Sequence, residues 1–300
     1  MADVNLTGVG VALATPFKKD YSIDYKALER LLVKVITGGI DYLVVLGTTA
    51  ETPTLTLEEK HELAKFIKDK TGGKLPLILG VGGNNTWGVV KDILSRDLSG
   101  YSAILSVAPY YNKPTQEGLF QHFKTISDAS PLPIILYNVP SRTGVNLTPR
   151  TTLRLAEYSS NICGVKEASG NLLQAQEIIN NSPSGFAVIS GNDSDTFDFM
   201  KAGAQGVISV LANALPAEVK KVVDLCRENK FEEAQNYQNI LGSIISPLFE
   251  DGNPGGIKAL LSQQGLIENI LRLPLVPVSK NVDDKLKKEI SNLYTKLSEI

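Results

Sequence analysis

The stretch Ile162-Cys163-Gly164-Val165-Lys166-Glu167-Ala168-Ser169-Gly170 joins a short apolar run to a lysine and then to a Ser-Gly turn. An apolar run without polar alternation is typical of a strand that is buried on both faces, as in a parallel sheet. A lysine at the end of such a strand points into the space on which the strand opens. Desolvation disfavours the ammonium form and favours a neutral amine, which can attack a carbonyl carbon. Taken alone this signal is weak, because most lysines are solvated surface residues.

Eight such apolar runs alternate with longer segments of helical period along the chain. The runs are Val9 to Ala14, Tyr42 to Leu46, Leu75 to Val81, Ala103 to Ala108, Ile134 to Asn138, Ile162 to Lys166, Ala187 to Ser190 and Gly206 to Val210. Eight strands, each followed by a helix, predict an α/β fold of the (β/α)8 TIM barrel type. A doubly wound sheet fits less well, because no Gly-x-Gly-x-x-Gly follows the first run.

Polar residues stand where several helices are expected to begin. Asp24, Thr115, Thr148 and Asp193 are candidate caps, and Thr56 forms a possible capping box with Glu59. After Ala214 the pattern is helical throughout, over Pro216 to Asn229, Phe231 to Phe249, Gly256 to Gln264 and Asp283 to Leu297. We therefore predict a catalytic barrel over residues 1–230 and a C-terminal helical extension, packed on the barrel, over residues 231–300.

The composition is that of a soluble globular protein. The 300 residues are 43% hydrophobic and 21% charged, with a formal net charge of −2 and no basic block, which argues against nucleic acid or an anionic membrane as the main partner. No apolar run approaches the roughly 20 residues that a membrane span requires. The first residues, Met1-Ala2-Asp3-Val4-Asn5, lack the pattern of a signal peptide, and only two cysteines occur, Cys163 and Cys226. A cytoplasmic location without disulfides is the expectation, with Cys163 a small buried hydrophobe.

Unusual residues collect where the predicted strands end, which is where a barrel of this type builds its active site. These segments are Gly47-Thr48-Thr49-Ala50-Glu51, Pro109-Tyr110-Tyr111-Asn112-Lys113-Pro114, Tyr137-Asn138-Val139-Pro140-Ser141-Arg142-Thr143-Gly144, Lys166, and Ser190-Gly191-Asn192-Asp193. Each one has an ordinary structural explanation as a turn, a cap or a surface charge. Together they supply an amine nucleophile, hydroxyl groups, main-chain amides and a guanidinium suited to a carboxylate. Those groups are what a 2-keto acid needs to form a Schiff base and to condense with a second carboxylated substrate.

Other chemistries lack their characteristic residues. His61 and His122 lie in helical segments and are expected on the surface, and neither His-Glu-x-x-His nor Cys-x-x-Cys occurs, so we expect no metal. The sequence also has no Gly-x-Ser-x-Gly elbow and no Walker-type loop. We therefore expect no nucleotide, flavin or other cofactor.

The strand-end motifs resemble those of the dihydrodipicolinate synthase/N-acetylneuraminate lyase superfamily. The resemblance lies in Gly47-Thr48-Thr49-Ala50-Glu51, Tyr137-Asn138-Val139-Pro140-Ser141-Arg142-Thr143-Gly144 and Gly164-Val165-Lys166-Glu167. It runs from about Gly8 to Asn213 and fades in the C-terminal helices. The Thr-Thr pair and Arg142 are similar to the synthase branch rather than to the sialic acid lyase branch.

The resemblance implies a role for each of these residues in condensing pyruvate with L-aspartate 4-semialdehyde, a step of lysine and diaminopimelate biosynthesis. Lys166 would form the Schiff base with pyruvate, and Tyr137, Thr48 and Tyr111 would relay protons. Thr49 would hold the pyruvate carboxylate, Arg142 the carboxylate of the semialdehyde, and Gly191 and the Ile208 carbonyl would line the pocket. In this family the counterpart of Tyr111 enters a neighbouring subunit, so a homotetramer built as a dimer of dimers is implied. No metal is implied, because the iminium itself is the electron sink.

Some positions depart from the family's pattern. Ala50 stands where glycine is usual, and a positive φ there would cost about 1 kcal/mol, so we expect local strain with retained activity. Glu167-Ala168 stands for the more common Asp-Ser or Asp-Thr, and Asn253-Pro254-Gly255-Gly256 for Asn-Pro-x-Pro. The positions that match the family's allosteric lysine site include Lys60, Asn84 and Tyr110, with Gly88 in place of a glutamate. Losing that carboxylate and gaining the Lys60 cation disfavours a cationic ligand, so weak or absent inhibition by lysine is expected.

Two alternatives remain open at this point. A relative with the same first half-reaction could use another aldehyde, as the N-acetylneuraminate and keto-deoxy-sugar-acid lyases do. Arg142 disfavours this alternative, because a polyhydroxylated sugar prefers neutral hydrogen-bonding groups. The other alternative is a catalytically inactive barrel with a binding role, which predicts that pyruvate forms no adduct.

Overall fold

The computed structural model describes residues 4–297 of the 300-residue chain. Met1-Ala2-Asp3, on which the expectation about a signal segment partly rests, lie outside the described residues. Within the described part, every helix is either too short or too polar to cross a membrane.

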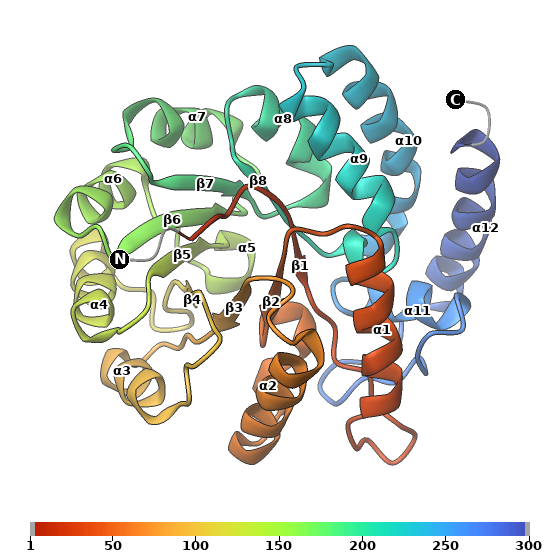
Figure 1. Ribbon diagram of the computed structural model, residues 1–300, viewed down its shortest axis with the longest axis horizontal. Helices are drawn as coiled ribbons and strands as arrows, with labels where there is room; N and C mark the ends of the chain where they lie inside the picture. The colour runs from red at the N-terminus through yellow and green to blue at the C-terminus, as the bar shows by residue number, and fades with distance from the viewer. Residues whose placement is uncertain (1–3, 298–300) are drawn as a thin grey trace. The chain divides into compact units, whose positions relative to one another are not determined.

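Eight strands form a closed barrel in the order β1 to β8 (Figure 1). They are β1 (Gly8–Ala12), β2 (Tyr42–Val45), β3 (Leu77–Gly80), β4 (Ala103–Val107), β5 (Ile134–Asn138), β6 (Ile162–Glu167), β7 (Ala187–Ser190) and β8 (Gly206–Ser209). Neighbouring strands from β2 to β8 pair in parallel. Almost every strand residue is buried, because helices cover one face and packed side chains fill the other. The predicted (β/α)8 TIM barrel is therefore confirmed.

The chain divides into two compact units. Among the described residues, the first consists of residues 4–10, 41–45 and 73–208, and the second of residues 11–40, 46–72 and 209–297. These units do not test the predicted domains, a catalytic barrel over residues 1–230 and a C-terminal helical extension over residues 231–300, and those domains stay a prediction.

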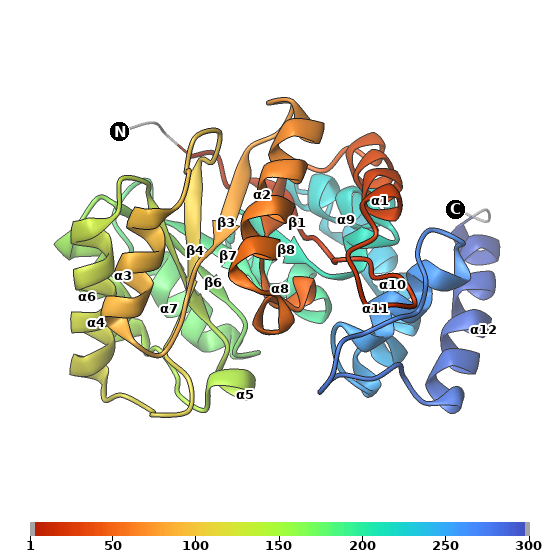
Figure 2. The same cartoon turned by 90° about the horizontal axis from the view of Figure 1, so that it is seen from below.

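The first unit carries the helices that follow strands β3 to β7. They are α3 (Thr86–Ser95), α4 (Gln116–Ala129), α5 (Pro140–Thr143), α6 (Pro149–Tyr158), α7 (Leu172–Asn181), the short 3₁₀ turn η3 (Asp193–Asp195) and α8 (Thr196–Lys201). Figure 2 shows α3, α4 and α6 side by side, and these helices contact one another in that order. Thr115 caps α4 through a hydrogen bond from the Gly118 amide, as predicted. Thr148 precedes α6 without capping it through its side chain, and Asp193 opens η3 rather than a full helix.

The second unit carries the remaining helices. They are α1 (Tyr25–Thr37), the 3₁₀ turns η1 (Thr48–Ala50) and η2 (Thr52–Thr54), α2 (Leu57–Thr71), the 3₁₀ turn η4 (Leu211–Asn213), α9 (Pro216–Arg227), α10 (Phe231–Glu250), α11 (Gly255–Gln263) and α12 (Lys280–Leu297). The cap at Asp24 and the capping box of Thr56 and Glu59 are both present. The helices α10, α11 and α12 pack against one another, as the prediction of a helical C-terminal region requires (Figure 1).

The prediction that His122 lies on the surface was wrong. His61 is exposed, but His122 is 3% exposed and packs edge-on against Phe123. Its Nδ1 lies 2.9 Å from Thr86 Oγ1, and burial lowers the pKa of His122 to about 4. The reason is the face of α4 on which it lies. His122 shares the apolar stripe of Leu119, Phe123 and Ile126, so it is a core residue that stays neutral.

Candidate functional site

Lys166 and Tyr137 are brought together at the ends of two neighbouring strands of the first unit. The parallel register pairs Tyr137 on β5 with Lys166 on β6. The Lys166 Nζ atom lies 4.6 Å from the centre of the Tyr137 ring. Lys166 is 4% exposed and Tyr137 is 7% exposed, so both side chains are withdrawn from bulk water. An amine beside a phenol in a dry strand end is an arrangement suited to forming and protonating an imine.

The residue after each member of this pair is also polar and buried. Asn138 and Glu167 are paired by the same register, and both are fully buried. Successive residues of a strand point to opposite faces of the sheet. Asn138 and Glu167 therefore face away from the side on which Tyr137 and Lys166 lie. Glu167 accepts hydrogen bonds from the side-chain amides of Asn138 and Gln174, at 2.9 and 2.8 Å.

Arg142 lies on the one-turn helix α5, directly after strand β5. Pro140 begins this helix and Gly144 ends it with a φ of +73°, a left-handed conformation that glycine adopts at little cost. Thr143 is buried and donates a hydrogen bond of 2.8 Å to the Val145 carbonyl. Arg142 itself is exposed. The turn thus presents a guanidinium close in sequence to Tyr137, on a segment that is held by its own hydrogen bonds.

Gly191 and Ile208 come from the next two strand ends of the first unit. The Gly191 amide donates a hydrogen bond of 2.8 Å to the Glu167 carbonyl. A β-carbon at position 191 would lie 2.5 Å from the Ala168 β-carbon, so only glycine fits between these backbones. Ile208 is fully buried in β8. The predicted contact of its carbonyl with substrate is not tested and stays a prediction.

Tyr110 and Tyr111 lie in the loop after β4. Tyr111 is 88% exposed and has a φ of +72°, a conformation that is strained for a bulky side chain. The Asn84 side chain donates to the Tyr110 carbonyl at 3.1 Å, and Asn112 donates to the Asn84 carbonyl at 3.0 Å. Two of the predicted allosteric positions, Asn84 and Tyr110, therefore lie together in this loop cluster.

Thr48 and Thr49 belong to the second unit, where they form the 3₁₀ turn η1 after β2. Thr49 is 1% exposed, and its hydroxyl accepts a hydrogen bond of 3.1 Å from the Asn253 side chain. The prediction of strain at Ala50 was wrong, because Ala50 is not among the residues with positive φ. The left-handed residues of this segment are Leu46 and Glu51, with φ of +58° and +53°. A methyl group at Ala50 therefore fits without backbone strain.

Glu51 ends this turn and is fully buried beside a buried lysine. Lys258, on α11, forms an ion pair with the Glu51 carboxylate, and both side chains are inaccessible to water. Lys258 also donates to the Ile270 carbonyl at 2.9 Å and lies 4.1 Å from the centre of the Phe17 ring. Burial lowers the pKa of Lys258 to about 8, because desolvation outweighs the attraction of Glu51.

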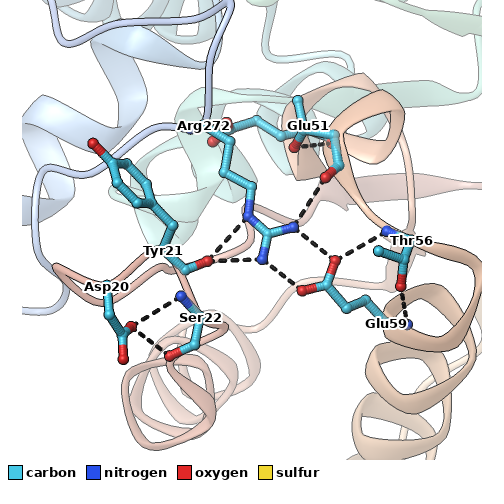
Figure 3. Close-up of polar contacts among 8 residues, drawn as sticks. Asp20, Tyr21, Ser22, Glu51, Thr56, Glu59 and Arg272 are labelled. Carbon is cyan, nitrogen blue, oxygen red and sulfur yellow. Dashed lines mark hydrogen bonds and ion pairs between the residues drawn. The ribbon is translucent and has the colours of Figure 1, made fainter.

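Arg272 completes this second-unit cluster (Figure 3). Its main-chain amide donates to Glu51 Oε2 at 2.9 Å. Its guanidinium holds Glu59 through two hydrogen bonds and also donates to the Tyr21 and Thr54 carbonyls. Arg272 is thereby joined to four residues of the second unit, Tyr21, Glu51, Thr54 and Glu59. Glu59, which also closes the capping box of α2, has its pKa lowered mainly by the hydrogen bond from Arg272.

Lys60, the remaining predicted allosteric position, lies on α2 in the second unit and is partly exposed. Among residues 4–297, His, Cys, Asp and Glu side chains nowhere form a group of three suited to a metal ion. Cys226 is buried as a small hydrophobe, whereas Cys163 is only partly buried.

The residues that support the site, unlike those expected to react, were not predicted from the sequence. Lys258 had a readable signal, because it is a single charge within the apolar segment Gly256-Ile257-Lys258-Ala259-Leu260-Leu261. The same reasoning that selected Lys166 applies to it. Asn138 and Glu167 also had a signal, since each is the polar neighbour of a predicted catalytic residue within a buried strand. Their partners Asn146 and Gln174 lie in a loop and a helix, and nothing in the sequence identifies them as partners.

Comparison with known proteins yields one consistent result. The model of the dihydrodipicolinate synthetase family matches residues 5–293. The 4-hydroxy-tetrahydrodipicolinate synthase of Parabacteroides distasonis is 51% identical over 296 residues, which cover 99% of this chain and 100% of that protein. The enzyme of the same name from Flavobacterium psychrophilum is 50% identical over 289 residues, 96% of this chain and 97% of that one.

Solved structures give the same result for the fold. The crystal structure of the dihydrodipicolinate synthase of Thermotoga maritima superposes with a TM-score of 0.95 and 38% sequence identity. The superposition covers 97% of this chain and 99% of that one. The similarity therefore extends over both units and includes the C-terminal helices.

Proposed function

The chain belongs to the dihydrodipicolinate synthetase family, and we propose that its catalytic centre is built on the pair Lys166 and Tyr137. The enzyme is a 4-hydroxy-tetrahydrodipicolinate synthase, a lyase that condenses pyruvate with L-aspartate 4-semialdehyde. The product belongs to lysine and diaminopimelate biosynthesis. The observation that carries the assignment of the centre is the 4.6 Å approach of the Lys166 amine to the Tyr137 ring, with both side chains buried.

The first half-reaction makes a nucleophile from pyruvate. The neutral amine of Lys166 adds to the pyruvate ketone carbon, and loss of water from the carbinolamine leaves a protonated imine. Tyr137 supplies the proton that departs with the water. The Tyr137 phenolate then takes a proton from the pyruvate methyl group, which gives an enamine with the iminium nitrogen as electron sink and restores the phenol.

The second half-reaction joins the two substrates and releases the enzyme. The enamine carbon attacks the aldehyde carbon of the semialdehyde, and Tyr137 protonates the new alkoxide. The substrate's own amine then adds to the imine carbon and displaces Lys166, which closes the ring and restores the free enzyme. Each bond to Lys166 that forms in the first half-reaction is thus broken in the second.

The remaining predicted residues take binding and relay roles in this proposal. Thr49 holds the pyruvate carboxylate, Arg142 holds the carboxylate of the semialdehyde, and Thr48 and Tyr111 transfer protons. Gly191 and Ile208 line the pocket. The burial of Thr49 and its hydrogen bond from Asn253 support its role, because a fixed hydroxyl is a better anchor than a mobile one.

The proposal extends to assembly, location and regulation. The enzyme is a cytoplasmic homotetramer, and the 88% exposure of Tyr111 on this chain supports a place for that side chain against a neighbouring subunit. Lysine inhibits it weakly or not at all, because Gly88 lacks a carboxylate and Lys60 adds a cation at the matching positions. An inhibition constant for lysine well below millimolar would contradict this part of the proposal.

Trapping of the Schiff base tests the catalytic centre. The protein is incubated with pyruvate and borohydride, and its intact mass is measured for the wild type and for Lys166→Ala. We expect a pyruvyl adduct on the wild type that Lys166→Ala lacks, together with turnover of aspartate semialdehyde in a coupled assay. An adduct without turnover points instead to an aldolase for another aldehyde. Absence of any adduct means that Lys166 is not the nucleophile.

A further inference from the structure

A buried carboxylate lies directly behind the proposed catalytic pair. Glu167 is the last residue of β6, immediately after Lys166, and it is fully buried. Its partner across the ladder is Asn138, immediately after Tyr137. Because side chains alternate along a strand, Glu167 and Asn138 occupy the face opposite to Lys166 and Tyr137. Any group that fixes Glu167 against Asn138 therefore also fixes the two strand ends that carry the pair.

The Glu167 carboxylate is held entirely by uncharged donors. The Asn138 side chain donates to it at 2.9 Å, the Gln174 side chain at 2.8 Å and the Ser169 amide at 2.7 Å. No lysine, arginine or histidine forms an ion pair with it among residues 4–297. A carboxylate can accept about four hydrogen bonds and donates none, so it suits a site where every neighbour is a donor.

The Asn138 and Gln174 side chains also bind the loop that follows α5, the helix that carries Arg142. Asn138 accepts a hydrogen bond of 2.9 Å from the Leu147 amide and donates one of 2.8 Å to Asn146. Asn146 in turn donates to the Gln174 side chain at 2.8 Å. The loop after α5, the start of α7 and the ends of β5 and β6 are thereby joined through one carboxylate.

The backbone adds a second layer to this connection. The Ala168 amide donates to the Asn138 carbonyl at 2.8 Å, and the Gly191 amide donates to the Glu167 carbonyl at the same distance. Glycine at position 191 allows this close approach of the two backbones, because a β-carbon there would lie only 2.5 Å from the Ala168 β-carbon. The position of Lys166 is therefore set by side chains on the face opposite to the catalytic pair and by backbone hydrogen bonds at the end of β6.

We propose that Glu167 is a positioning residue for Schiff-base formation, acting through an amide cage made of Asn138, Asn146 and Gln174. This inference rests on the proposed function, since it concerns the geometry of Lys166 and Tyr137. Formation of an imine requires the amine and its proton donor in near-attack geometry, and a displacement of about 1 Å costs about 100-fold in rate. An amide at position 167 would present its own N–H groups to the Asn138 and Gln174 donors and would push the strand end away from them.

Glu167→Gln is the principal test, with the trapping rate and the steady-state constants as readouts. We expect the rate of borohydride-trapped adduct and kcat both to fall about tenfold or more, with the KM for pyruvate changed less than about threefold. Glu167→Asp keeps the charge and the acceptors, and it should recover most of the lost rate. A smaller folded fraction would also lower the apparent kcat without changing KM, so both rates are expressed per mole of folded protein, measured by circular dichroism, and compared with those of a destabilised control.

Asp41→Asn is the matched control for a carboxylate that accepts a main-chain hydrogen bond. Asp41 accepts a hydrogen bond of 2.7 Å from the Val9 amide. It directly precedes β2 and therefore lies at the amino-terminal end of that strand. In TIM barrels that end serves stability rather than catalysis. We expect Asp41→Asn to lower the melting temperature while it leaves the trapping rate within about twofold of the wild type.

The outcomes separate the inference from the function on which it rests. If the wild type forms an adduct and Glu167→Gln forms it at the wild-type rate, the inference is wrong and the proposed function stands. An equal loss of rate in Asp41→Asn and Glu167→Gln also overturns it. If the wild type forms no adduct, both fail. Should Glu167→Gln not fold, Gln174→Met removes one donor of the cage, and an unchanged trapping rate in that variant is equally decisive.

Discussion

Glu51 and Glu167 are both fully buried glutamates at the end of a strand or of the turn that follows it, but the protein compensates their charges differently. Glu51 has a lysine partner, Lys258, and a single main-chain donor from Arg272. Glu167 has three uncharged donors. The buried charge of Glu51 is compensated mainly by one residue distant in sequence, whereas the buried charge of Glu167 is compensated by several neutral hydrogen-bond donors. The two sites should therefore respond differently to single substitutions.

Lys258→Met should produce the largest effect on stability. It leaves the Glu51 charge buried without its cation, and breaking a buried ion pair in this way costs about 3–5 kcal/mol. Urea unfolding followed by circular dichroism measures the loss. The double variant Glu51→Gln, Lys258→Met is the control and should recover a large part of it, because it removes both charges together. A double variant no more stable than Lys258→Met would show that the charge of Glu51 is not the cause.

The same pair should make the effect of Lys258→Met depend on pH. Lysine titrates near 10.4 in an unfolded chain, whereas burial lowers the pKa of Lys258 to about 8. Between these values the unfolded wild type binds more protons at this residue than the folded one, so the residue's contribution to the free energy of unfolding rises with pH. We therefore expect the stability gap between wild type and Lys258→Met to widen from pH 8 to pH 10. A gap that narrows over this range would contradict the lowered pKa.

Glu167→Gln should cost less stability than Lys258→Met, about 2 kcal/mol. It removes the charge but keeps one acceptor for the donors around it, and the cost comes from donors that face one another. No cation is left behind, so a second substitution should not restore stability as it does at Glu51. Urea unfolding of both variants at the same pH gives the comparison. A loss as large as that of Lys258→Met would mean that the neutral donors around Glu167 leave it as sensitive to a single substitution as the ion pair leaves Glu51.

Arg272→Lys should have the smallest effect, about 1 kcal/mol. Lysine cannot reproduce the two-pronged contact with Glu59 or the bonds to the Tyr21 carbonyl. The hydrogen bond to Glu51 comes from the main chain of Arg272, and it survives the substitution. Thermal unfolding should therefore show a modest fall. A fall as large as that for Lys258→Met would show that the guanidinium, and not Lys258, compensates Glu51.

Much of the barrel could be predicted from the sequence. The errors lie at positions where hydrogen bonding rather than burial determines where a strand ends. The runs Ile134–Asn138 and Ala187–Ser190 have the predicted limits. The first strand ends at Ala12 although Leu13 and Ala14 are equally buried, because the Ala14 amide bonds to the Asn213 side chain instead of to a strand. An apolar pattern reports burial, but it does not report which group accepts a hydrogen bond.

The candidate site shows the same limit. Lys166 and Tyr137 were predicted at strand ends, and the structure brings them together. Their support could not be derived, because Gln174 and Asn146 are ordinary polar residues until the fold places them against Glu167. Reacting groups belong to few residue types and stand at predictable places in a barrel. The groups that hold them are common residue types, and only their three-dimensional neighbours distinguish them.

The contact between Arg272 and Glu51 joins residues 221 positions apart, and this separation has a consequence for synthesis on the ribosome. At about 5–20 residues per second, roughly 10–45 s pass between the emergence of Glu51 and that of Arg272. During that interval the turn that carries Thr48 and Thr49 exists without the residues that neutralise its glutamate. The nascent chain must therefore keep this carboxylate hydrated until the last quarter of the protein arrives, and a chain that is released early has no means of burying it.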